Sequence, residues 1–474
     1  MSEKKQANEF FSRNRLSRRR FLGYMAAASA GGALAACQPQ ASPTAAPAAS
    51  GEVKETAPTA QPESSAGKTT IEMWMWETQE RWLRVEAASG LNEEFPDVEF
   101  KWTALPYGDL HQKALTSMAA GLAEGLPSIV RTGAGYYRPF ANSGGIMDVT
   151  EYVTPYEKDV LPYYWAESII DDRIYQFPDD TGVMMFGYRW DIFEEAGLPS
   201  APDEVFELFA TYDDLLTAGQ KLLDETGSKL FNMTPDAGVF NNMIIQDTTG
   251  YFDADGEVVF DSDQHALVAQ TVKRMFDSGL TTRYDQGPQI WQAYKDGELA
   301  CMFYPNWQDF VVIDQAPDTV GKWRVTRMPA VMPGGRRGSV QNGCLLVIPA
   351  AKPAEERDLA ARVATHMKFT EKATVAHMRE FSGAFVSYIP GLEAMADFPS
   401  PVLDEQYVYQ LYLKTAEEED ILPWYRSTTA FYNDAGTAAS EALFKILDQN
   451  APIEETLKAA ADSVRSIQDQ KGMK

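Results

Sequence analysis

Apolar and polar residues alternate over two short stretches near the start of a long folded region. Residues 70–76 and 98–105 alternate as half-buried strands do, and residues 77–95 and 109–123 repeat apolar positions at helical spacing. Residues 128–130 form a further short apolar run. Because strands and helices alternate along the chain, the pattern predicts a parallel sheet with crossover helices, and therefore an α/β fold.

The same patterns predict elements in the rest of the chain. Thr211 and Asp214 stand at capping-box spacing before LLTAGQKLL, which predicts a helix that ends at Gly227. Within the first two strands, the alternation directs Trp74 and Trp102 into the core. The remaining expected elements are a turn and strand over 252–261, strands over 300–304 and 344–348, and helices over 265–278, 354–380 and 452–468.

The chain opens with a basic segment, followed by an apolar run that ends on Cys37. Residues 21–36 are uncharged and rich in Ala and Gly, whereas a membrane-spanning helix needs about 20 strongly apolar residues. The basic flank, the short apolar run and the small residues at its end predict a secretory signal peptide over residues 1–36. A helix that stays in the membrane as an anchor is the alternative.

Two details of this segment resemble known export signals. SRRRFL at residues 17–22 resembles the twin-arginine signal, whose pathway carries folded proteins. LAAC at residues 34–37 resembles the lipobox of bacterial lipoproteins. By this resemblance, Cys37 is the first residue of the mature chain and carries lipid, which holds a protein firmly in a bilayer when several acyl chains are attached.

Residues 37–68 are expected to join the lipid to the folded part as a disordered linker. They contain five prolines and no hydrophobic periodicity. As a coil this segment spans roughly 30 Å, and as polyproline II it reaches up to about 95 Å. The globular part then starts near Thr69, off the membrane surface.

Charge narrows the choice of partners. Residues 1–36 hold seven Lys or Arg and two Asp or Glu, and the rest of the chain has 35 basic and 66 acidic residues, a formal charge of −31. Such a surface repels nucleic acid and anionic lipid, so we expect no nucleic-acid partner. The aromatic residues, ten Trp among them, can build a core or form flat platforms for sugars.

Candidate catalytic chemistry is sparse. The sequence has no H-E-x-x-H, nucleophile elbow, P-loop or paired-cysteine metal motif. Asp179 and Asp180 are adjacent, so in a strand their side chains are expected to diverge and to make a poor acid/base pair. Cys301 and Cys344 lie in apolar, strand-like runs and are expected to be buried free thiols, with a disulfide as the alternative. We therefore expect no enzyme, no cofactor and no metal site.

Several stretches occur in an order that matches one protein family. They are LNEEFPDVEFKW at 91–102, YQFPDDT at 175–181, YRWDIFEEAGL at 188–198, KDGELACM followed by PNW at 295–307, and the segment 321–349. From Thr69 to the C-terminus the series resembles the extracellular solute-binding proteins of ABC importers, family 1 or the maltose-binding type. Arg189 stands where the family usually has Asn, and Asn306 where it usually has Gly.

The resemblance implies a two-lobe α/β fold, each lobe an open sheet flanked by helices, with a ligand cleft between the lobes. Open α/β sheets bind ligands at the carboxyl ends of their strands, which agrees with the pattern of strands and helices. The expected crossings between lobes lie near 181–187, 325–340 and 385–395. The expected N-terminal lobe is 69–183 plus 340–392, and the expected C-terminal lobe is 184–339 plus 393–474.

The resemblance also implies where a ligand is held. Trp76 and Glu77 end the first strand, and Asp180 aligns with an acidic site position of the family. Trp307 matches a stacking Trp of the sugar-binding members, and Tyr432 falls where those members place a stacking aromatic residue. Asn342 lies at a return crossing and offers an amide. Tyr136, or its neighbour Tyr137, follows small residues that let a ligand approach the backbone.

The plainer alternatives assign these residues to the structure alone. Trp76 is then a core residue, Asp180 a solvated acid at the hinge, and the late aromatic cluster that includes Trp424 and Tyr425 a part of the core. The ligand-binding set that we predict is Trp76, Glu77, Tyr136, Asp180, Trp307, Asn342 and Tyr432.

Together these features predict a monomeric, lipid-anchored protein on the outer face of the cytoplasmic membrane. It captures a mono- or oligosaccharide between two lobes and delivers it to the membrane permease subunits of an ABC transporter. The alternatives are another small polar solute such as a glycerol phosphate or polyamine, a surface sensor or adhesion lipoprotein without transport, and a carbohydrate-active enzyme.

Overall fold

The computed structural model describes residues 67–285, 287–418 and 429–470. The signal peptide, Cys37, nearly all of the linker, and Trp424 and Tyr425 lie outside these residues. Within the described residues, no helix has both the length and the apolar character that crossing a membrane requires.

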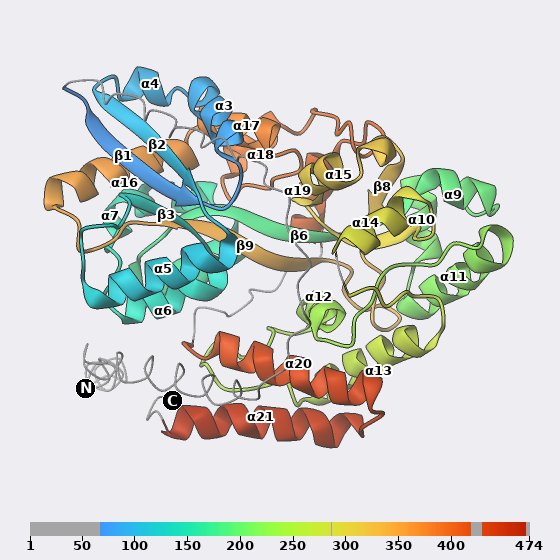
Figure 1. The fold of residues 1–474 in the computed structure, drawn as a ribbon. Coiled ribbons are helices and arrows are strands. Elements are labelled where there is room, and N and C mark those ends of the chain that lie inside the picture. Colours follow the sequence, from blue (N-terminus) through green and yellow to red (C-terminus); the bar gives the residue numbers. More distant parts are fainter. Residues whose placement is uncertain (1–66, 286, 419–428, 471–474) are drawn as a thin grey trace, which may run out of the picture.

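One mixed sheet runs through the molecule (Figure 1). β1 (Thr69–Met75) pairs in parallel with β2 (Val98–Ala104) and β3 (Ile129–Gly133), which confirms the predicted parallel arrangement of the first three strands. β9 (Ser339–Val347) then pairs antiparallel with both β3 and β6 (Phe177–Arg189), and β6 also pairs with β7 (Cys301–Pro305) and β8 (Trp323–Thr326). β4 (Ile169–Ile170) and β5 (Arg173–Ile174) form a separate ladder.

The two halves share one continuous ladder, because the strand that crosses between them pairs in both. β6 is buried along its whole length and carries the sheet from one half of the molecule into the other. Its first part pairs with β9, and its last part pairs with β7 and β8. Beyond this sheet, the second half adds isolated parallel bridges, Lys229 to Leu299 and Asn232 to Thr282.

Two hydrophobic clusters lie on opposite faces of the first three strands. Trp74 belongs to the smaller cluster, which helices α5 (Tyr107–Ala120) and α6 (Tyr137–Asn142) help to build. Trp102 belongs to the larger cluster and stacks on Trp82 of α3 (Gln79–Ser89), with ring centroids 5.4 Å apart. Both predicted core tryptophans are buried, because alternation along a strand sends successive side chains to opposite faces.

Local sequence explains where several helices begin and end. The capping box at Thr211 and Asp214 is present, and α11 (Tyr212–Thr226) ends at Gly227 in the left-handed conformation, both as predicted. The single helix predicted over 77–95 is two helices, because Gly90 adopts a φ of 84° between α3 and α4 (Leu91–Glu94).

Two further predictions need correction. The helix predicted over 354–380 is also divided, since the Thr370 side chain accepts a hydrogen bond from the Ala373 amide and begins a new helix there. The strand predicted over 252–261 is only an isolated bridge between Phe252 and Val258. The Asp253 carboxylate accepts the amides of Asp255 and Glu257, which holds this segment as a turn.

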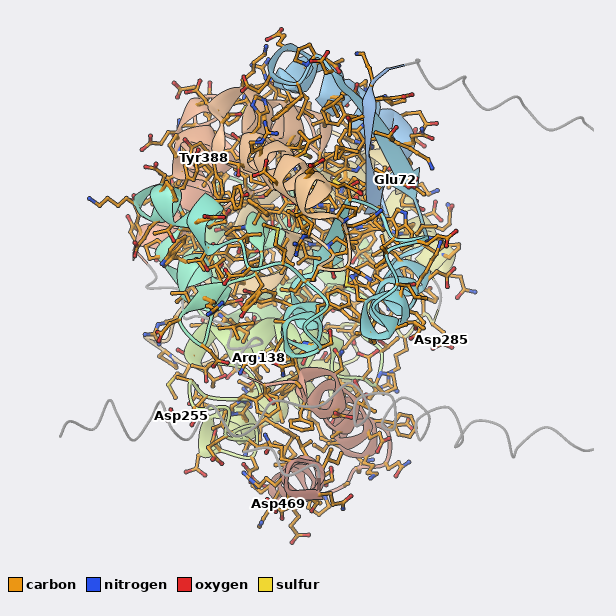
Figure 2. All side chains as sticks on the ribbon, turned by 90° about the vertical axis from the view of Figure 1, so that its left-hand side faces the viewer. Glu72, Arg138, Asp255, Asp285, Tyr388 and Asp469 are labelled. Carbon is orange, nitrogen blue, oxygen red and sulfur yellow. The ribbon has the colours of Figure 1, made fainter. Side chains whose placement is uncertain are left out.

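The other helices cover the sheet and build the second half (Figure 1). α20 (Tyr432–Asp448) and α21 (Ile453–Gln470) pack on each other and on α13 (Asp263–Asp277) at the lower end of the molecule. Exposed carboxylates such as Asp255, Asp285 and Asp469 lie at the outside of the chain (Figure 2). The remaining bounds are η1 (Ala134–Tyr136), α7 (Thr150–Val153), η2 (Thr154–Asp159), α8 (Pro162–Ser168), α9 (Trp190–Glu195), α10 (Pro202–Leu208), α12 (Gly238–Asp247), α13 (Asp263–Asp277), α14 (Gly287–Lys295), α15 (Gln308–Gln315), η3 (Pro317–Thr319), α16 (Ala354–Phe369), α17 (Glu371–Glu380), α18 (Ile389–Ala394), α19 (Val408–Glu418), α20 (Tyr432–Asp448) and α21 (Ile453–Gln470).

Three segments lie side by side where the two halves meet. β9 follows one edge of β6, with Val183 opposite Val340 and Met184 opposite Ser339. On the other edge of β6, the segment 385–387 is hydrogen-bonded to residues 179–181. These segments fall within or next to the crossings that the sequence predicts, and they bring the ends of β1 and β3 close to β6.

Candidate functional site

Aromatic side chains gather at the carboxyl ends of the three parallel strands. Trp76 follows β1, Tyr107 follows β2, and Tyr136 lies in η1 directly after β3. The ring centroids of Trp76 and Tyr107 are 5.1 Å apart in a T-shaped contact, and Tyr136 stacks on His111 of α5 at 4.0 Å. Trp76 and Tyr136 are partly exposed, so this edge presents aromatic surface to solvent.

His111 is a neutral support for these rings. Its Nδ1 lies 2.7 Å from the Tyr107 carbonyl oxygen, and its Nε2 accepts the Gly133 amide at 3.0 Å. Those two partners fix the tautomer with the proton on Nδ1. Burial lowers the pKa of His111 to about 4, so the ring is uncharged at neutral pH.

Arg131, which no sequence motif marks, is bonded to several of the predicted residues. Its guanidinium, on buried strand β3, donates from Nε to Asp179 at 2.7 Å and from Nη2 to Asp180 at 2.8 Å. Nη1 makes a close ion pair with Glu77. The guanidinium also lies over the Trp76 ring, 4.6 Å from its centroid. One buried cation therefore binds three carboxylates and an aromatic face.

The prediction that Asp179 and Asp180 diverge is wrong. Both carboxylates bond the same guanidinium. The pairing of β6 with β9 shifts register between Pro178 and Thr181, and such an irregularity re-aims side chains that regular alternation would send apart. Asp180 is 8% exposed, so it is also not a solvated acid.

Lys368 of α16 completes the ion cluster from the opposite side. It makes a close ion pair with Asp179, and His377 Nδ1 lies 3.7 Å from the same carboxylate. Burial alone would raise the pKa of Asp179, but Lys368 and Arg131 lower it below its ordinary value. Burial raises the pKa of Asp180, and the neighbouring Asp179 charge adds to this rise. Burial lowers the pKa of His377, which leaves it neutral.

Two neighbouring tyrosines follow β3 and differ in exposure: Tyr136 is partly exposed, whereas Tyr137 is buried. Tyr137 is buried, and its hydroxyl donates to the Ser168 carbonyl at 2.6 Å, so it supports the fold. Tyr432, at the start of α20, comes close to this segment, because a Cβ on Gly135 would lie 3.5 Å from Tyr432 Cδ1. The Tyr432 ring is also 5.7 Å from that of Tyr251. The structure thus brings Tyr432 next to the Tyr136 segment from a distant part of the chain.

Trp307 and Asn342 lie on opposite sides of β6, apart from this group. Trp307 is half-buried and follows β7, where the preceding Asn306 amide donates to the Val183 carbonyl of β6. Asn342 lies in β9 immediately before Gly343, which pairs with Thr181. Both residues are therefore close in the backbone ladder to the irregular part of β6, and the side chain of Asn342 is outside the described part of the chain.

A pocket of about 370 Å³ lies next to Trp307 in the second half of the molecule. Its lining includes Gln308, Asn242 of α12 and the aromatic rings of Phe303 and Trp291. The Asn242 side-chain oxygen is buried and has no hydrogen-bond partner within the described residues. This pocket could not be predicted from the sequence, because its walls come from separate segments between residues 231 and 308.

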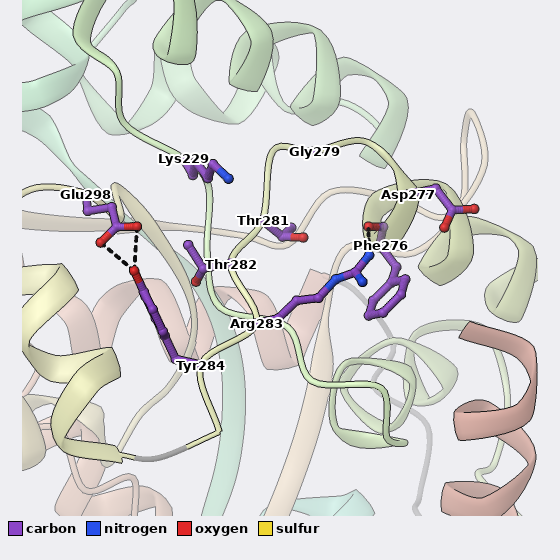
Figure 3. Close-up of a pocket in the computed structure, with 9 residues that line it drawn as sticks. All are labelled: Lys229, Phe276, Asp277, Gly279, Thr281, Thr282, Arg283, Tyr284 and Glu298. Carbon is purple, nitrogen blue, oxygen red and sulfur yellow. Dashed lines mark hydrogen bonds between the residues drawn. The ribbon is translucent and has the colours of Figure 1, made fainter. Parts of the chain in front are cut away.

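A larger pocket, of about 460 Å³, lies elsewhere and has a different character (Figure 3). The Tyr284 hydroxyl lies 2.8 and 2.9 Å from the two Glu298 carboxylate oxygens. Arg283 lies 3.8 Å over the Phe276 ring and donates to the carbonyl of that residue. The Tyr284 hydroxyl and the Arg283 guanidinium are thus both bonded within the protein.

Two further expectations concern cysteines and metals. Cys301 of β7 and Cys344 of β9 are free thiols, as predicted, but only Cys301 is fully buried, since Cys344 is partly exposed. Burial raises the pKa of both thiols, which keeps them protonated. No group of three or more His, Cys, Asp or Glu side chains among the described residues is arranged to hold a metal ion.

The fold is the two-lobe α/β fold of periplasmic sugar-binding proteins. The GacH receptor of Streptomyces glaucescens, solved without ligand and with acarbose, aligns with a TM-score of 0.68 at 18% identity, over 84% of this chain and 98% of that one. An ABC-transporter-associated binding protein of B. animalis subsp. lactis, solved with β-1,6-galactobiose, also aligns with a TM-score of 0.68, at 19% identity over 86% and 99% of the two chains.

The chain belongs to the family of bacterial extracellular solute-binding proteins, whose family model matches residues 76–368. An arabinooligosaccharide-binding protein of Bacillus subtilis is 27% identical over 319 residues, which are 65% of this chain and 71% of that protein. A lactose-binding protein of Rhizobium radiobacter is 25% identical over 411 residues, 84% and 92% of the two chains. The resemblance stated from the sequence is confirmed.

Proposed function

We propose that this protein binds a neutral mono- or oligosaccharide between its two lobes as the extracytoplasmic binding component of an ABC importer. The observation that carries the proposal is the combination of half-buried Trp76 and Tyr136 rings with the ion cluster around Arg131. Sugars present flat patches of C–H groups that suit aromatic rings, and hydroxyls that suit fixed polar groups. Unpaired buried hydroxyls cost about 1–3 kcal/mol, so such polar groups confer specificity.

The charges of this site favour a neutral ligand over the two charged alternatives. Arg131 and Lys368 are both 2% exposed and both paired with carboxylates, so neither offers a ready partner for a phosphate. Glu77, Asp179 and Asp180 are likewise bonded to Arg131 or Lys368, so none of them is a ready partner for a polyamine. A glycerol phosphate or a polyamine would need this cluster to open, whereas a sugar would not.

The named relatives support the same ligand class. The relatives from B. subtilis and R. radiobacter are described as binding arabinooligosaccharide and lactose, and the structure from B. animalis holds a galactobiose. Each is a binding protein, which favours binding without turnover. An importer component of this family works outside the cytoplasm, captures its solute and passes it to a permease.

We further propose the lobe boundaries and the way the protein is held. The division into 69–183 plus 340–392 and 184–339 plus 393–474 is supported by β6 and β9, since residues 183–184 of β6 pair opposite residues 339–340 of β9. A ligand that contacts both lobes would bind the closed form more tightly than the open form, and would therefore shift the protein toward the closed form. A monomer tethered by lipid at Cys37, after twin-arginine export, would present this cleft at the outer face of the cytoplasmic membrane.

A thermal-shift and calorimetry screen of the purified protein tests the ligand class. The panel is an arabino-oligosaccharide, lactose, β-1,6-galactobiose and maltose, against glycerol 3-phosphate and spermidine. A ligand at 100 times its dissociation constant stabilises the protein by about 2.7 kcal/mol, which moves the melting temperature measurably. We expect a sugar to do so and to be recovered unchanged by chromatography. A shift with only a charged solute would remove the sugar proposal, and new products would support the enzyme alternative.

Replacing Trp307 by Ala is expected to weaken sugar binding by at least tenfold while the protein stays folded. The half-buried ring would be lost as a stacking surface, and its removal leaves most of the core untouched. The dissociation constant is measured by calorimetry and the fold by circular dichroism. Trp190→Ala is the matched control, because Trp190 is also partly buried but bonds Gly321 away from this site. Equal affinity in Trp307→Ala and the wild type would take Trp307 out of the site.

Replacing Cys37 by Ala is expected to move the protein from the membrane fraction to the soluble fraction. Loss of the thiol removes the point of acylation, so no acyl chain can hold the protein in the bilayer. Fractionation followed by immunoblotting measures this. Cys301→Ala controls for loss of a thiol elsewhere, since Cys301 is buried and free. Continued membrane attachment of Cys37→Ala would favour the retained anchor helix over a cleaved signal.

A further inference from the structure

We propose that Arg131 is a positioning residue that sets the orientation of Trp76 and Glu77 and ties both to strand β6. This inference rests on the proposed sugar site, but it concerns a residue that need not touch the sugar. Its guanidinium is 2% exposed. Its effect on a ligand would therefore pass through the side chains that it holds.

The contacts of Arg131 come from three separate parts of the chain. Strand β3 supplies Arg131, the segment after β1 supplies Trp76 and Glu77, and β6 supplies Asp179 and Asp180. The segment 76–78 lies between β1 and α3 and is in neither element. A segment of this kind has few backbone bonds of its own, so side-chain contacts decide its position.

Both carboxylate oxygens of Glu77 have a partner. One oxygen pairs with Arg131, and the other accepts from the Trp82 indole at 3.4 Å. Trp76 in turn has the guanidinium over its face at 4.6 Å, and the ring centroids of Tyr107 and His111 lie 5.1 and 5.8 Å from its own. Without the guanidinium, Trp76 would lose one of these three contacts and Glu77 would lose its counter-charge.

The same guanidinium connects this segment to the place where the halves meet. Asp180 forms a bridge with Val386, and β6 runs on into the pairing with β7. Movement of β6 relative to β1 would therefore have to change the bonds of Arg131. Lys368 remains on Asp179 from the far side and keeps that carboxylate paired when Arg131 is removed.

Affinity measurements on two substitutions test this role. Arg131→Met is expected to weaken binding of the sugar found in the screen by about 100-fold, and Arg131→Lys by about tenfold, since Lys keeps the charge but not the forked geometry. Arg189→Met is the matched control. Arg189 is also a buried arginine that pairs with an aspartate, Asp191, and its guanidinium lies 5.8 Å from the Trp323 ring centroid. Unlike Arg131, it is the last residue of β6 and contacts none of the predicted site residues. Its removal is expected to lower stability and leave affinity within twofold.

A double-mutant cycle separates positioning from direct contact. If Arg131 acts through Glu77, Arg131→Met has a much smaller effect on affinity when Glu77 is already Gln. Additive effects of the two substitutions would overturn the positioning role. Unchanged affinity in Arg131→Met, at a temperature where circular dichroism shows it folded, would overturn it as well.

A measurement without ligand tests whether Arg131 holds the Trp76 ring in place, even if no sugar binds. Acrylamide quenching of Trp76 is obtained as the fluorescence difference between each protein and the same protein carrying Trp76→Phe. We expect the quenching constant of Trp76 to rise at least twofold in Arg131→Met and to stay unchanged in Arg189→Met. A constant equal to that of the wild type would show that Arg131 does not hold Trp76, whereas failure of the sugar screen alone would count only against the proposed function.

Discussion

Replacing Asp179 by Asn is expected to lower the free energy of unfolding by about 3–5 kcal/mol. Asp179 is fully buried and accepts from both Arg131 and Lys368. Removing one partner from a buried ionic group leaves the other charges without compensation, which costs far more than the pair itself contributes. Urea unfolding at pH 7 followed by circular dichroism measures the change.

An exposed aspartate provides the control for this substitution. Asp277 pairs with Lys273 one helical turn away, and its side chain is 53% exposed. Asp277→Asn is therefore expected to cost less than about 1 kcal/mol, as exposed pairs do. If the two substitutions cost the same, the cluster around Arg131 would not be a tightly coupled buried network.

The stabilisation by Asp179 has a defined pH dependence. Its pKa is lowered in the folded protein, so its contribution is complete well above the ordinary value of 3.8 and is lost as pH falls through the lowered folded value. The difference in unfolding free energy between the wild type and Asp179→Asn is therefore expected to stay constant from pH 7 to about pH 5 and to shrink below pH 4. A difference that grew on acidification would contradict the lowered pKa.

Replacing Gly383 by Ala is expected to destabilise the protein by at least about 3 kcal/mol and to weaken ligand binding. Gly383 has a φ of 84°, and a Cβ there would clash with the Asn306 carbonyl oxygen. The clash is with backbone, so a side-chain rotation cannot relieve it. Displacement of Asn306 would also move Trp307, the next residue. Urea unfolding and calorimetry with the sugar ligand measure the two effects.

A second glycine separates strain from the clash. Gly279 has a φ of 78°, but a Cβ there meets nothing within 4 Å. Gly279→Ala then isolates the cost of the left-handed conformation, about 1–2 kcal/mol, without a steric contact. Similar losses for both substitutions would show that the segment around Gly383 yields easily.

Alternation and capping chemistry made much of the fold predictable. The strands at 69–75 and 98–104, the buried sides of Trp74 and Trp102, and the start of α11 at Thr211 all depend on neighbours in sequence. The antiparallel pairing of β3 with β9 could not be predicted from neighbours in sequence. It lies more than 200 residues later, and the periodicity of a strand carries no information about which strand it joins.

The residues of the candidate site that follow strands could be predicted from the sequence, but Arg131, which joins them, could not. Trp76, Tyr136 and Asp180 were reached from their positions after strands and in family motifs. Arg131 was missed, because its partners lie 48 to 54 residues away and no local motif marks it. The available signal was a single cation within the buried run SIVRTG, since a buried arginine requires paired carboxylates.

The strand order also bears on how the chain reaches its native state. β3, which is made early, completes its pairing only with β9, which ends at residue 347. The first half of the molecule therefore cannot finish its sheet until most of the chain has been synthesised. Pairings between such distant segments make folding slow, because a long loop must close before the contacts form. The proposed twin-arginine route, which carries folded proteins, would suit a chain with this strand order.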